Sequence, residues 1–217
     1  MNRTSKMNYE LVIFDLDGTL LNTSQGIYNS VRYAEKQLNL PPIEDSLLPI
    51  FVGPPPAQMY QKHYGLTERE ALRAAQYHRE YSRKYGIYEA EIYEGMKEVL
   101  EGLKERGLKT AVATLKSQEI AEKILEHFDL RDYFDVIIGM DKEESLTKAD
   151  TIQMSREAVG SKGKAVLIGD SRYDQEGAEE AGIDFIGVLY GFGFQSEEEL
   201  KGKKYVYRVD QLKDMGI

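Results

Sequence analysis

The sequence contains no cysteine, and this absence excludes several kinds of chemistry. A disulfide framework, a thiolate zinc site and a cysteine nucleophile all require that residue. Histidine is nearly as scarce, because the only three, His63, His78 and His127, lie far apart and show no metal-ligand spacing. We interpret each histidine as solvated or locally hydrogen-bonded, so a metal site in this chain would have to be built from oxygen atoms.

Long apolar runs and an excess of positive charge are also missing. No stretch approaches the roughly 20 apolar residues of a membrane span, and the polar residues 1–8 lack the apolar run of a signal peptide. We therefore expect a cytoplasmic protein with no membrane partner. Lysine and arginine total 28 against 37 aspartates and glutamates, a net charge of −9. This balance argues against a nucleic-acid partner and favours a small ligand.

What the sequence does contain is an alternation of strand-like and helix-like segments. Short apolar runs rich in β-branched residues lie at 11–14, 110–113, 136–138, 165–168 and 185–189. Because these runs are apolar on both faces, they suit the strands of a parallel sheet covered by helices. The sequence predicts an α/β fold, an open parallel sheet with helices on both faces. Helices are expected at 95–106, 117–127, 148–159, 172–181 and 210–215.

The stretch between Asn22 and Ile92 breaks this alternation, because it has no strand-like run and shows helical patterns at 25–39, 57–64 and 67–86. We predict an inserted helical domain over 22–92 and an α/β core formed by 1–21 and 93–217. Four tyrosines follow helical spacing and could face a substrate, but packing within the helical insertion is the interpretation we favour. They are Tyr77, Tyr81, Tyr85 and Tyr88.

The strongest chemical signal is the segment Asp15-Leu16-Asp17-Gly18-Thr19, directly after the first apolar run. Carboxylates at i and i+2 of an extended segment point to the same side of the chain. An acidic pair at the end of a buried strand is costly to keep ionised, which indicates a bound metal or a catalytic role. The alternative is that Asp17 and Gly18 simply form a turn.

Polar groups also follow the other predicted strands. The run 165–168 leads to Asp170, with Asp174 four residues later, the run ending at 113 leads to Thr114, and Lys148 lies at a predicted helix start. Carboxyl ends of parallel strands share one edge of a sheet, so we expect these side chains to converge. Oxygen ligands alone favour a hard cation, and Mg²⁺ also tolerates phosphate oxygens. A carboxylate there can act as nucleophile while a neighbouring carboxylic acid protonates the leaving group.

These segments, in this order, resemble the four motifs of the haloacid dehalogenase-like superfamily, and the resemblance spans nearly the whole chain. The helical insertion resembles the small cap domain of that family. The segments Gly53-Pro54-Pro55 and 187–191 resemble its phosphoglycolate phosphatase-like branch. Two departures are Asn22, where an acidic residue is frequent, and Leu115, where a small polar residue is frequent.

The resemblance implies a role for each acidic residue. Asp15 is the nucleophile and a metal ligand, while Asp17 acts as acid and then base and binds the metal through its backbone carbonyl. Asp170 is a metal ligand. Asp174 is a metal-site residue, with direct coordination and a place in the outer shell both left open.

The resemblance also implies how the phosphoryl group is held. Thr114 would bind it through the hydroxyl and Lys148 through the ammonium group, which adds both to the catalytic residues. Lys142 lies near Lys148 in the sequence and is the alternative phosphate-binding lysine. The implied substrate-binding residues are Gly18, Gly53, Thr114, Leu115 and Lys148.

The sequence therefore predicts a Mg²⁺-dependent phosphatase that hydrolyses a small phosphomonoester through an aspartyl phosphate. Phosphoglycolate-like compounds, nucleotides and sugar phosphates all remain open as substrates, and the chain is expected to be a monomer or homodimer. One alternative is a phosphomutase of the β-phosphoglucomutase type, against which Thr19 argues, because sugar phosphomutases tend to carry an aliphatic residue there. A second is a non-catalytic module that binds phosphate esters, against which the intact pair of Asp15 and Asp17 argues.

Overall fold

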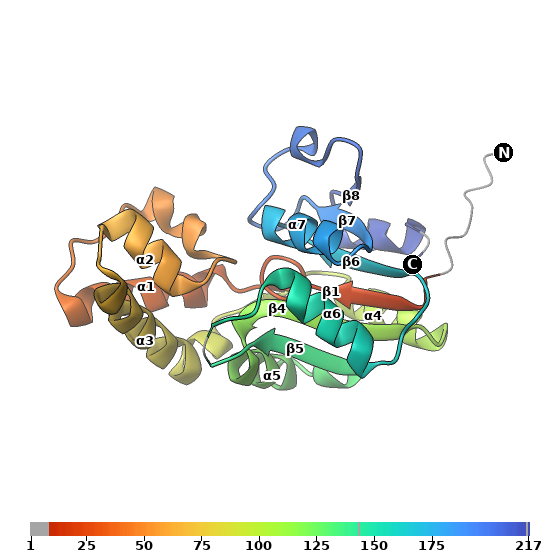
Figure 1. Cartoon of the computed structure of the whole chain (residues 1–217), viewed down its shortest axis with the longest axis horizontal. Helices are drawn as coiled ribbons and strands as arrows, with labels where there is room; N and C mark the ends of the chain where they lie inside the picture. The colour runs from red at the N-terminus through yellow and green to blue at the C-terminus, as the bar shows by residue number, and fades with distance from the viewer. Residues whose placement is uncertain (1–8, 143, 216) are drawn as a thin grey trace.

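The computed structural model describes residues 9–142, 144–215 and 217, so the predicted absence of a signal peptide in 1–8 lies outside the described residues. A six-stranded sheet in the order β5-β4-β1-β6-β7-β8 forms the centre of the core, and all its neighbouring strands are parallel (Figure 1). This sheet, covered by helices, confirms the predicted fold class. Its strands are β1 (Leu11–Phe14), β4 (Lys109–Ser117), β5 (Val136–Met140), β6 (Ala165–Gly169), β7 (Asp184–Val188) and β8 (Lys204–Val206).

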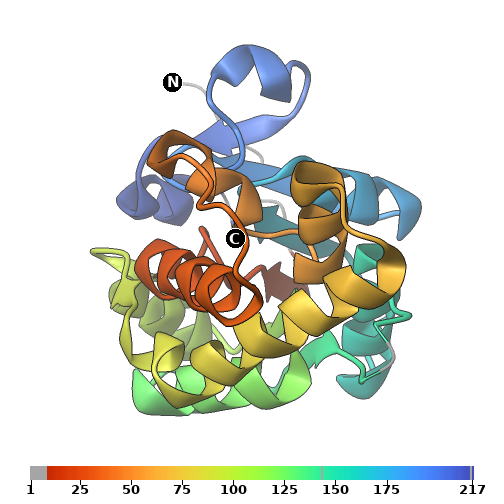
Figure 2. The same cartoon turned by 90° about the vertical axis from the view of Figure 1, so that its left-hand side faces the viewer.

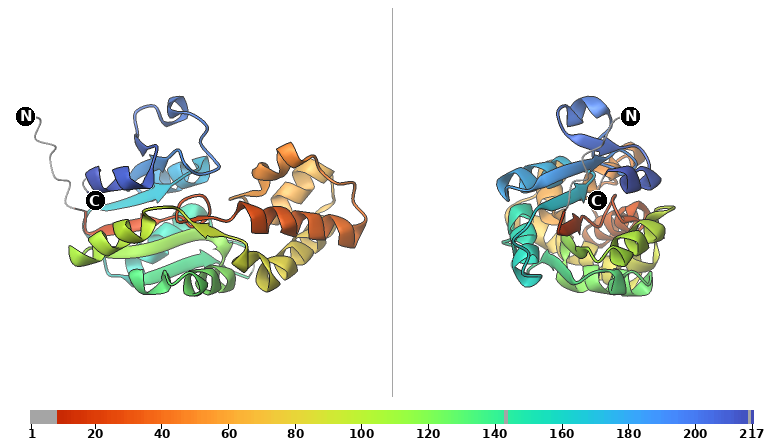
Figure 3. Two further views of the ribbon diagram at one scale, coloured as in Figure 1. Left: turned by 180° about the vertical axis from the view of Figure 1, so that it is seen from behind. Right: turned by 90° about the vertical axis from the view of Figure 1, so that its right-hand side faces the viewer.

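Strand β1 lies in the middle of the sheet because both of its faces are apolar. Val12 and Phe14 belong to one hydrophobic core, and Leu11 and Ile13 belong to the other. The first core is covered by α4 (Met96–Glu105) and α5 (Gln118–His127), and the second by α6 (Lys148–Ala158) and α7 (Arg172–Glu180). Helix α6 lies in front of the sheet in Figure 1, and α4 lies in front in the left view of Figure 3.

Two elements differ from the expectation. Strand β8 was not predicted, because it is only three residues long, lies at the edge of the sheet and follows a lysine-rich turn that carries no apolar run. The helix expected at 210–215 is instead a 3₁₀ helix over Val209–Asp214. No helix among the described residues is long and apolar enough to cross a bilayer.

We refer to residues 22–92, the predicted insertion, as the cap. The three helices expected there are present, joined by a 3₁₀ helix over Asp45–Phe51, and they pack around a separate hydrophobic core that includes Val31, Tyr60 and Ala74. Figures 1 and 2 show this group beyond the carboxyl ends of the strands. The cap helices are α1 (Ser24–Leu38), α2 (Pro56–Tyr64) and α3 (Glu68–Lys84).

The chain passes between core and cap twice, and the two crossings are paired. Strand β2 (Leu21–Asn22) is antiparallel to β3 (Glu91–Ile92). The side-chain oxygen of Asn22 accepts hydrogen bonds from the backbone N–H and the hydroxyl of Ser24, at 3.2 and 2.7 Å. Asn22, one of the departures from the family pattern, therefore holds the start of α1.

The tyrosine stripe of the cap is a partly exposed aromatic row. The ring of Tyr33 on α1 lies 6.4 Å from that of Tyr77 and 5.6 Å from that of Tyr81. Tyr85 and Tyr88 are exposed. Tyr77 and Tyr81 therefore pack between α1 and α3, as the favoured interpretation predicts. Tyr85 and Tyr88 do not enter a buried core.

Candidate active site

Asp15 and Asp17 follow β1 at the edge of the sheet that faces the cap, and both are buried. Gly18 has a φ of +79°, and a Cβ atom there would lie 2.2 Å from Oδ2 of Asp170. Only glycine can turn the chain in this conformation so close to a second carboxylate. The turn that the alternative interpretation proposed is therefore present, and it brings the acidic segment against the end of β6.

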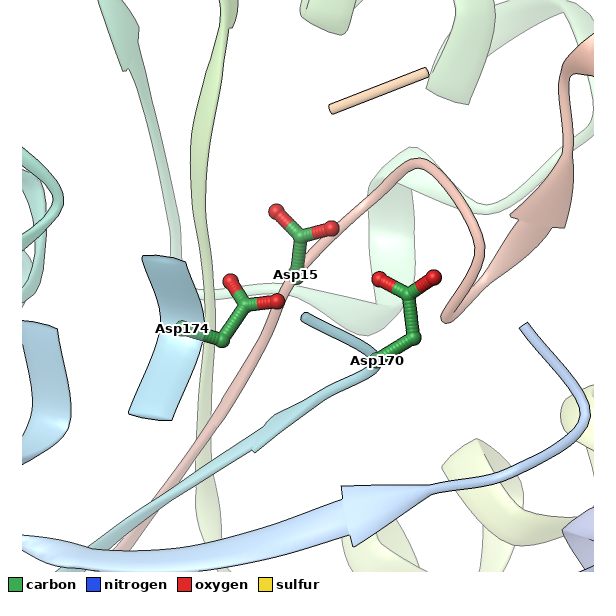
Figure 4. Close-up of side chains that lie close together, drawn as sticks. All are labelled: Asp15, Asp170 and Asp174. Atoms are coloured by element: carbon green, nitrogen blue, oxygen red, sulfur yellow. The ribbon is translucent and has the colours of Figure 1, made fainter. Parts of the chain in front are cut away.

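Three carboxylates from separate elements form a cluster. Ligand oxygens of Asp15, Asp170 and Asp174 all lie within 4.8 Å of one another, and Figure 4 shows the three side chains around one space. Burial raises the pKa of Asp15 well above its usual range, and the charges of Asp174 and Asp170 add to this, while Lys148 opposes it. Burial, followed by the charge of Asp174, also raises the pKa of Asp170 to about 7. Such crowding disfavours full ionisation and could be relieved by a bound cation.

Lys148 lies among these carboxylates. Its Nζ atom is 2.5 Å from Oδ1 of Asp15 and 2.6 Å from Oδ1 of Asp174, and the side chain is only 5% exposed. Burial by itself would lower the pKa of Lys148, but the two carboxylates raise it above the usual value. The first position of α6 is electrostatically poor for a cation, so its charge must be compensated by these partners. Lys142, the alternative lysine, is exposed.

Asp170 is held by backbone groups that the sequence did not suggest. Its Oδ2 atom accepts hydrogen bonds from the backbone N–H groups of Phe192, at 2.7 Å, and Gly193, at 3.0 Å. Gly191 makes this approach possible, because a Cβ there would lie 2.4 Å from Cβ of Asp170. The glycine pair after β7 was the available signal, but its importance depends on β6 and β7 being neighbours.

Asp174 is anchored through both carboxylate oxygens. Oδ2 accepts hydrogen bonds from the backbone N–H and hydroxyl of Ser171 in a capping box at the start of α7, and Oδ1 faces Lys148. Among the described residues, this leaves Oδ2 of Asp15 and Oδ1 of Asp170 without a hydrogen bond or ion pair. The oxygen atoms free to bind a metal are carboxylate oxygens, so the site fits a hard cation.

The carboxylate of Asp17 is not part of this cluster. Its Oδ1 atom accepts a hydrogen bond of 2.5 Å from the hydroxyl of Thr23, the residue before α1, and its Oδ2 atom lies 3.1 Å from Nζ of Lys116. Thr23 and Lys116 were not predicted as site residues. Asp17 is consequently held at the boundary between core and cap.

The structure brings the other predicted site residues to one small chamber. Thr114 lies there at the end of the regular part of β4, and its hydroxyl accepts a hydrogen bond of 3.2 Å from the backbone N–H of Lys116. Gly53 reaches the chamber from the cap, and the exposed Tyr173 was not expected to line it. The predicted site residues that line the chamber are Asp15, Asp17, Gly53, Thr114, Leu115, Lys148, Asp170 and Asp174.

A second cavity, of about 60 Å³, adjoins this chamber. Asp17, Gly53 and Leu115 line both spaces. The second cavity lies between cap and core, with His78 and Arg79 of α3 on one side and Glu144 of the loop after β5 on the other.

This combination of a parallel sheet, a helical cap and a buried acidic cluster with a lysine defines a class of protein, the hydrolases that act on phosphate esters. Residues 12–188 match the family model described as haloacid dehalogenase-like hydrolase, and the chain belongs to that family. This match confirms the predicted resemblance to the haloacid dehalogenase-like superfamily.

Similar proteins support the same class. The chain is 36% identical over 203 residues to a 5'-nucleotidase from Pseudomonas aeruginosa, covering 92% of this chain and 90% of that protein. It is 31% identical over 200 residues to a phosphoglycolate phosphatase from Agrobacterium fabrum, covering 87% and 84%. A crystal structure of a predicted phosphatase from Clostridium acetobutylicum superposes with a TM-score of 0.88, at 37% identity, over 95% of this chain and 97% of that one.

Proposed function

We propose that the chain is a Mg²⁺-dependent phosphatase that hydrolyses a small phosphomonoester through an aspartyl phosphate on Asp15. The observation that carries this proposal is the placement of Lys148 against the buried Asp15, beside the free oxygens of Asp15 and Asp170. With Lys148 and a bound cation compensating its charge, the carboxylate of Asp15 can ionise and attack, while an acid on the far side serves the leaving group.

The proposed metal site is formed by Asp15, Asp170 and the backbone carbonyl of Asp17, with Asp174 in the outer shell. This last assignment rests on the Asp174 oxygens, since both already have partners. A bound Mg²⁺ would offset negative charge on the transferring phosphoryl group. The carboxylate of Asp170 is kept in place for this by its two backbone N–H donors.

The proposed reaction has two displacements. A carboxylate oxygen of Asp15 attacks phosphorus, the bond from phosphorus to the leaving oxygen breaks, and Asp17 donates a proton to that oxygen. Asp17 then takes a proton from a water molecule, which attacks phosphorus, and the bond to Asp15 breaks to release inorganic phosphate. Thr114 and Lys148 hold the phosphoryl oxygens in both displacements, and the substrate-binding residues Gly53 and Leu115 line the chamber. Gly18, also predicted to bind substrate, does not line the chamber but turns the chain against Asp170.

The test is release of inorganic phosphate from a panel of phosphomonoesters, with and without Mg²⁺, using Asp15→Ala protein to control for contaminating phosphatases. Mg²⁺-dependent release that disappears in the variant supports the proposal. Transfer of phosphate to a second hydroxyl without release would indicate a phosphomutase, and binding without either reaction would indicate a non-catalytic module.

The setting of this activity is part of the proposal. We infer a small phosphorylated metabolite as substrate, the cytoplasm as compartment and a monomer or homodimer as assembly. The proposed domains are the core, 1–21 and 93–217, and the cap, 22–92, with the paired strands β2 and β3 as the hinge. Cell fractionation tests the compartment, the mass in solution tests the assembly, and limited proteolysis at the hinge tests the division into domains.

A further inference from the structure

The cavity between cap and core lies on the leaving-group side of the proposed reaction. Asp17, the proposed acid, lines both this cavity and the phosphate chamber, whereas Arg79 and Glu144 line only the cavity. If Asp17 protonates the leaving oxygen, the rest of the alcohol must extend past it into this space. The side chains of the cavity therefore bear on which alcohol is accepted, an inference that rests on the proposed function.

The size of the cavity limits that alcohol. Its volume of about 60 Å³ is several times the roughly 10–15 Å³ that holds one water molecule. The enclosed part of the cavity therefore holds a few non-hydrogen atoms, and most of a nucleoside would lie outside it. A short leaving group fits the space as it stands.

The polar groups of the cavity are suited to an anion. Arg79 and Lys116 supply positive charge, and their side chains are only 21% and 13% exposed. His78 stays neutral, because burial, with the nearby Lys116 and Arg79, lowers its pKa to about 3. The hydroxyl of Ser117 is buried and has no hydrogen-bond partner among the described residues. Two cations, each paired with a carboxylate of the same cavity, and a free donor thus line one space.

The cations are not equivalent. Lys116 lies against Asp17 and cannot change partner without disturbing the proposed acid. Arg79 instead pairs across the boundary between cap and core with Glu144, which has a φ of +53° on the loop after β5. A guanidinium group binds both carboxylate and phosphate groups, often through two parallel hydrogen bonds. An anion on the substrate can therefore take the place of the Glu144 carboxylate.

We propose that Arg79 is a specificity residue that binds an anionic group, a carboxylate or a second phosphate, on a short leaving group. Glu144 occupies the guanidinium in the absence of substrate and competes with that anion. The favoured substrates are phosphomonoesters of small hydroxy acids or of comparably small phosphorylated alcohols. Nucleotides and phosphomonoesters with an uncharged leaving group are disfavoured.

The experiment measures kcat/KM for 2-phosphoglycolate and for its amide, in which an uncharged carboxamide replaces the carboxylate. The two phosphate esters have nearly the same size. The wild-type protein should prefer the acid. Arg79→Gln should reduce the ratio of the two kcat/KM values about 10- to 100-fold, the loss expected for one hydrogen-bonded charge pair. Glu144→Gln should change the ratio in the opposite direction, because it removes the competing carboxylate.

A matched control is Arg83→Gln. Arg83 lies one turn further along α3 and pairs with Glu119 of the core at 3.3 Å, but it does not line the cavity. This variant should keep the wild-type ratio. If Arg79→Gln and Glu144→Gln instead change both esters equally and in the same direction, the ion pair is only a clamp between cap and core, and the subsite does not exist.

Two further outcomes separate this inference from the proposed function. Hydrolysis of both esters with no preference, or a higher kcat/KM for 5'-AMP than for the acid, would overturn the subsite and leave the phosphatase intact. Hydrolysis of none of these three compounds would count against the proposed function. Calorimetric binding of the two esters to Asp15→Asn protein then decides the subsite independently, since a preference for the acid that Arg79→Gln removes supports it and equal binding refutes it.

Discussion

The ammonium nitrogen of Lys148 lies 2.5 Å from a carboxylate oxygen of Asp15, although 133 positions separate the two residues in the sequence. This contact joins the end of β1 to the start of α6 inside the protein. Space for the lysine is left by α7, where a Cβ atom on Gly177 would lie 2.6 Å from Cγ of Lys148. The pair compensates two charges that would each be unstable alone in a buried site.

Removing this lysine should have two effects. Lys148→Ala leaves the buried carboxylates of Asp15 and Asp174 without their cation, so we expect loss of turnover and a loss of about 3–5 kcal/mol in the free energy of unfolding without metal. Phosphate release and urea denaturation measure the two effects. Lys142→Ala is the control and should match the wild type in both, because Lys142 is exposed. Full activity in Lys148→Ala protein would show that another cation holds the phosphoryl group.

The two aspartates of the first motif should respond differently to substitution. Asp15→Asn removes the nucleophile, so no phosphate release is expected. Asp17→Asn keeps the hydrogen-bonding shape but cannot donate the proton, and kcat/KM, which reports on the first displacement, should fall by about 10²–10⁴-fold. The fall should be smallest for an ester such as 4-nitrophenyl phosphate, whose leaving group needs no proton. An equal loss with all leaving groups would argue against Asp17 as the acid.

Metal binding should be visible in the absence of substrate. Saturating Mg²⁺ at about 100 times its dissociation constant is expected to stabilise the fold by about 2.7 kcal/mol, which thermal unfolding detects. Asp170→Asn removes one of the free carboxylate oxygens and should abolish most of this gain. Asp17→Asn should retain it, because the side chain of Asp17 faces Thr23 and Lys116 and not the cluster. A wild-type thermal midpoint that does not change with Mg²⁺ would contradict the metal site.

The glycine after β7 offers a test of how Asp170 is held. In Gly191→Ala protein the new Cβ would lie 2.4 Å from both Cβ of Asp170 and the carbonyl oxygen of Gly18, so the loop must move. We expect weaker Mg²⁺ binding, measured by calorimetry, together with reduced turnover. Gly102→Ala is the control, since its Cβ would meet only a distant arginine nitrogen at 4.0 Å within a helix. This control should be slightly more stable than the wild type.

His78 should make stability depend on pH. Its pKa is lowered by burial to about 3 in the folded protein, below the unfolded value of about 6.5, so the unfolded state binds more protons between these limits. Stability from this residue is therefore present above pH 6.5 and is lost as the pH falls toward 3. From pH 7 to pH 5 the loss should be about 2 kcal/mol.

The raised pKa values of Asp15 and Asp170 oppose this trend, because those groups bind protons more readily when folded. The quantity to measure is therefore the difference in unfolding free energy between the wild type and His78→Gln, in urea at pH 7 and at pH 5. Acidification should destabilise the wild type relative to the variant. A difference that does not change with pH would show that the pKa of His78 is not lowered in the folded protein.

Much of the fold could be predicted because the signals are local. Apolar runs as short as β1 and β6, rich in β-branched residues, fit buried strands better than helices. The helical stretch between Asn22 and Ile92 has no such run and so interrupts the alternation. Strand β8 was missed because an edge strand of three residues has one hydrogen-bonded neighbour and no buried run. The tyrosine stripe was partly misjudged, since helical spacing indicates a shared face but not how deeply that face is covered.

The sequence by itself determined the class of this protein and its acidic residues, because Asp15 and Asp170 each follow a buried strand, and the carboxyl ends of parallel strands share one edge of a sheet. Only the tertiary structure decided the contacts between distant segments. It placed Lys148 rather than Lys142 at Asp15, occupied both oxygens of Asp174, and set Arg79 against Glu144 across the cap boundary. Each of these depends on how loops and helix starts approach in space, which spacing along the chain does not specify.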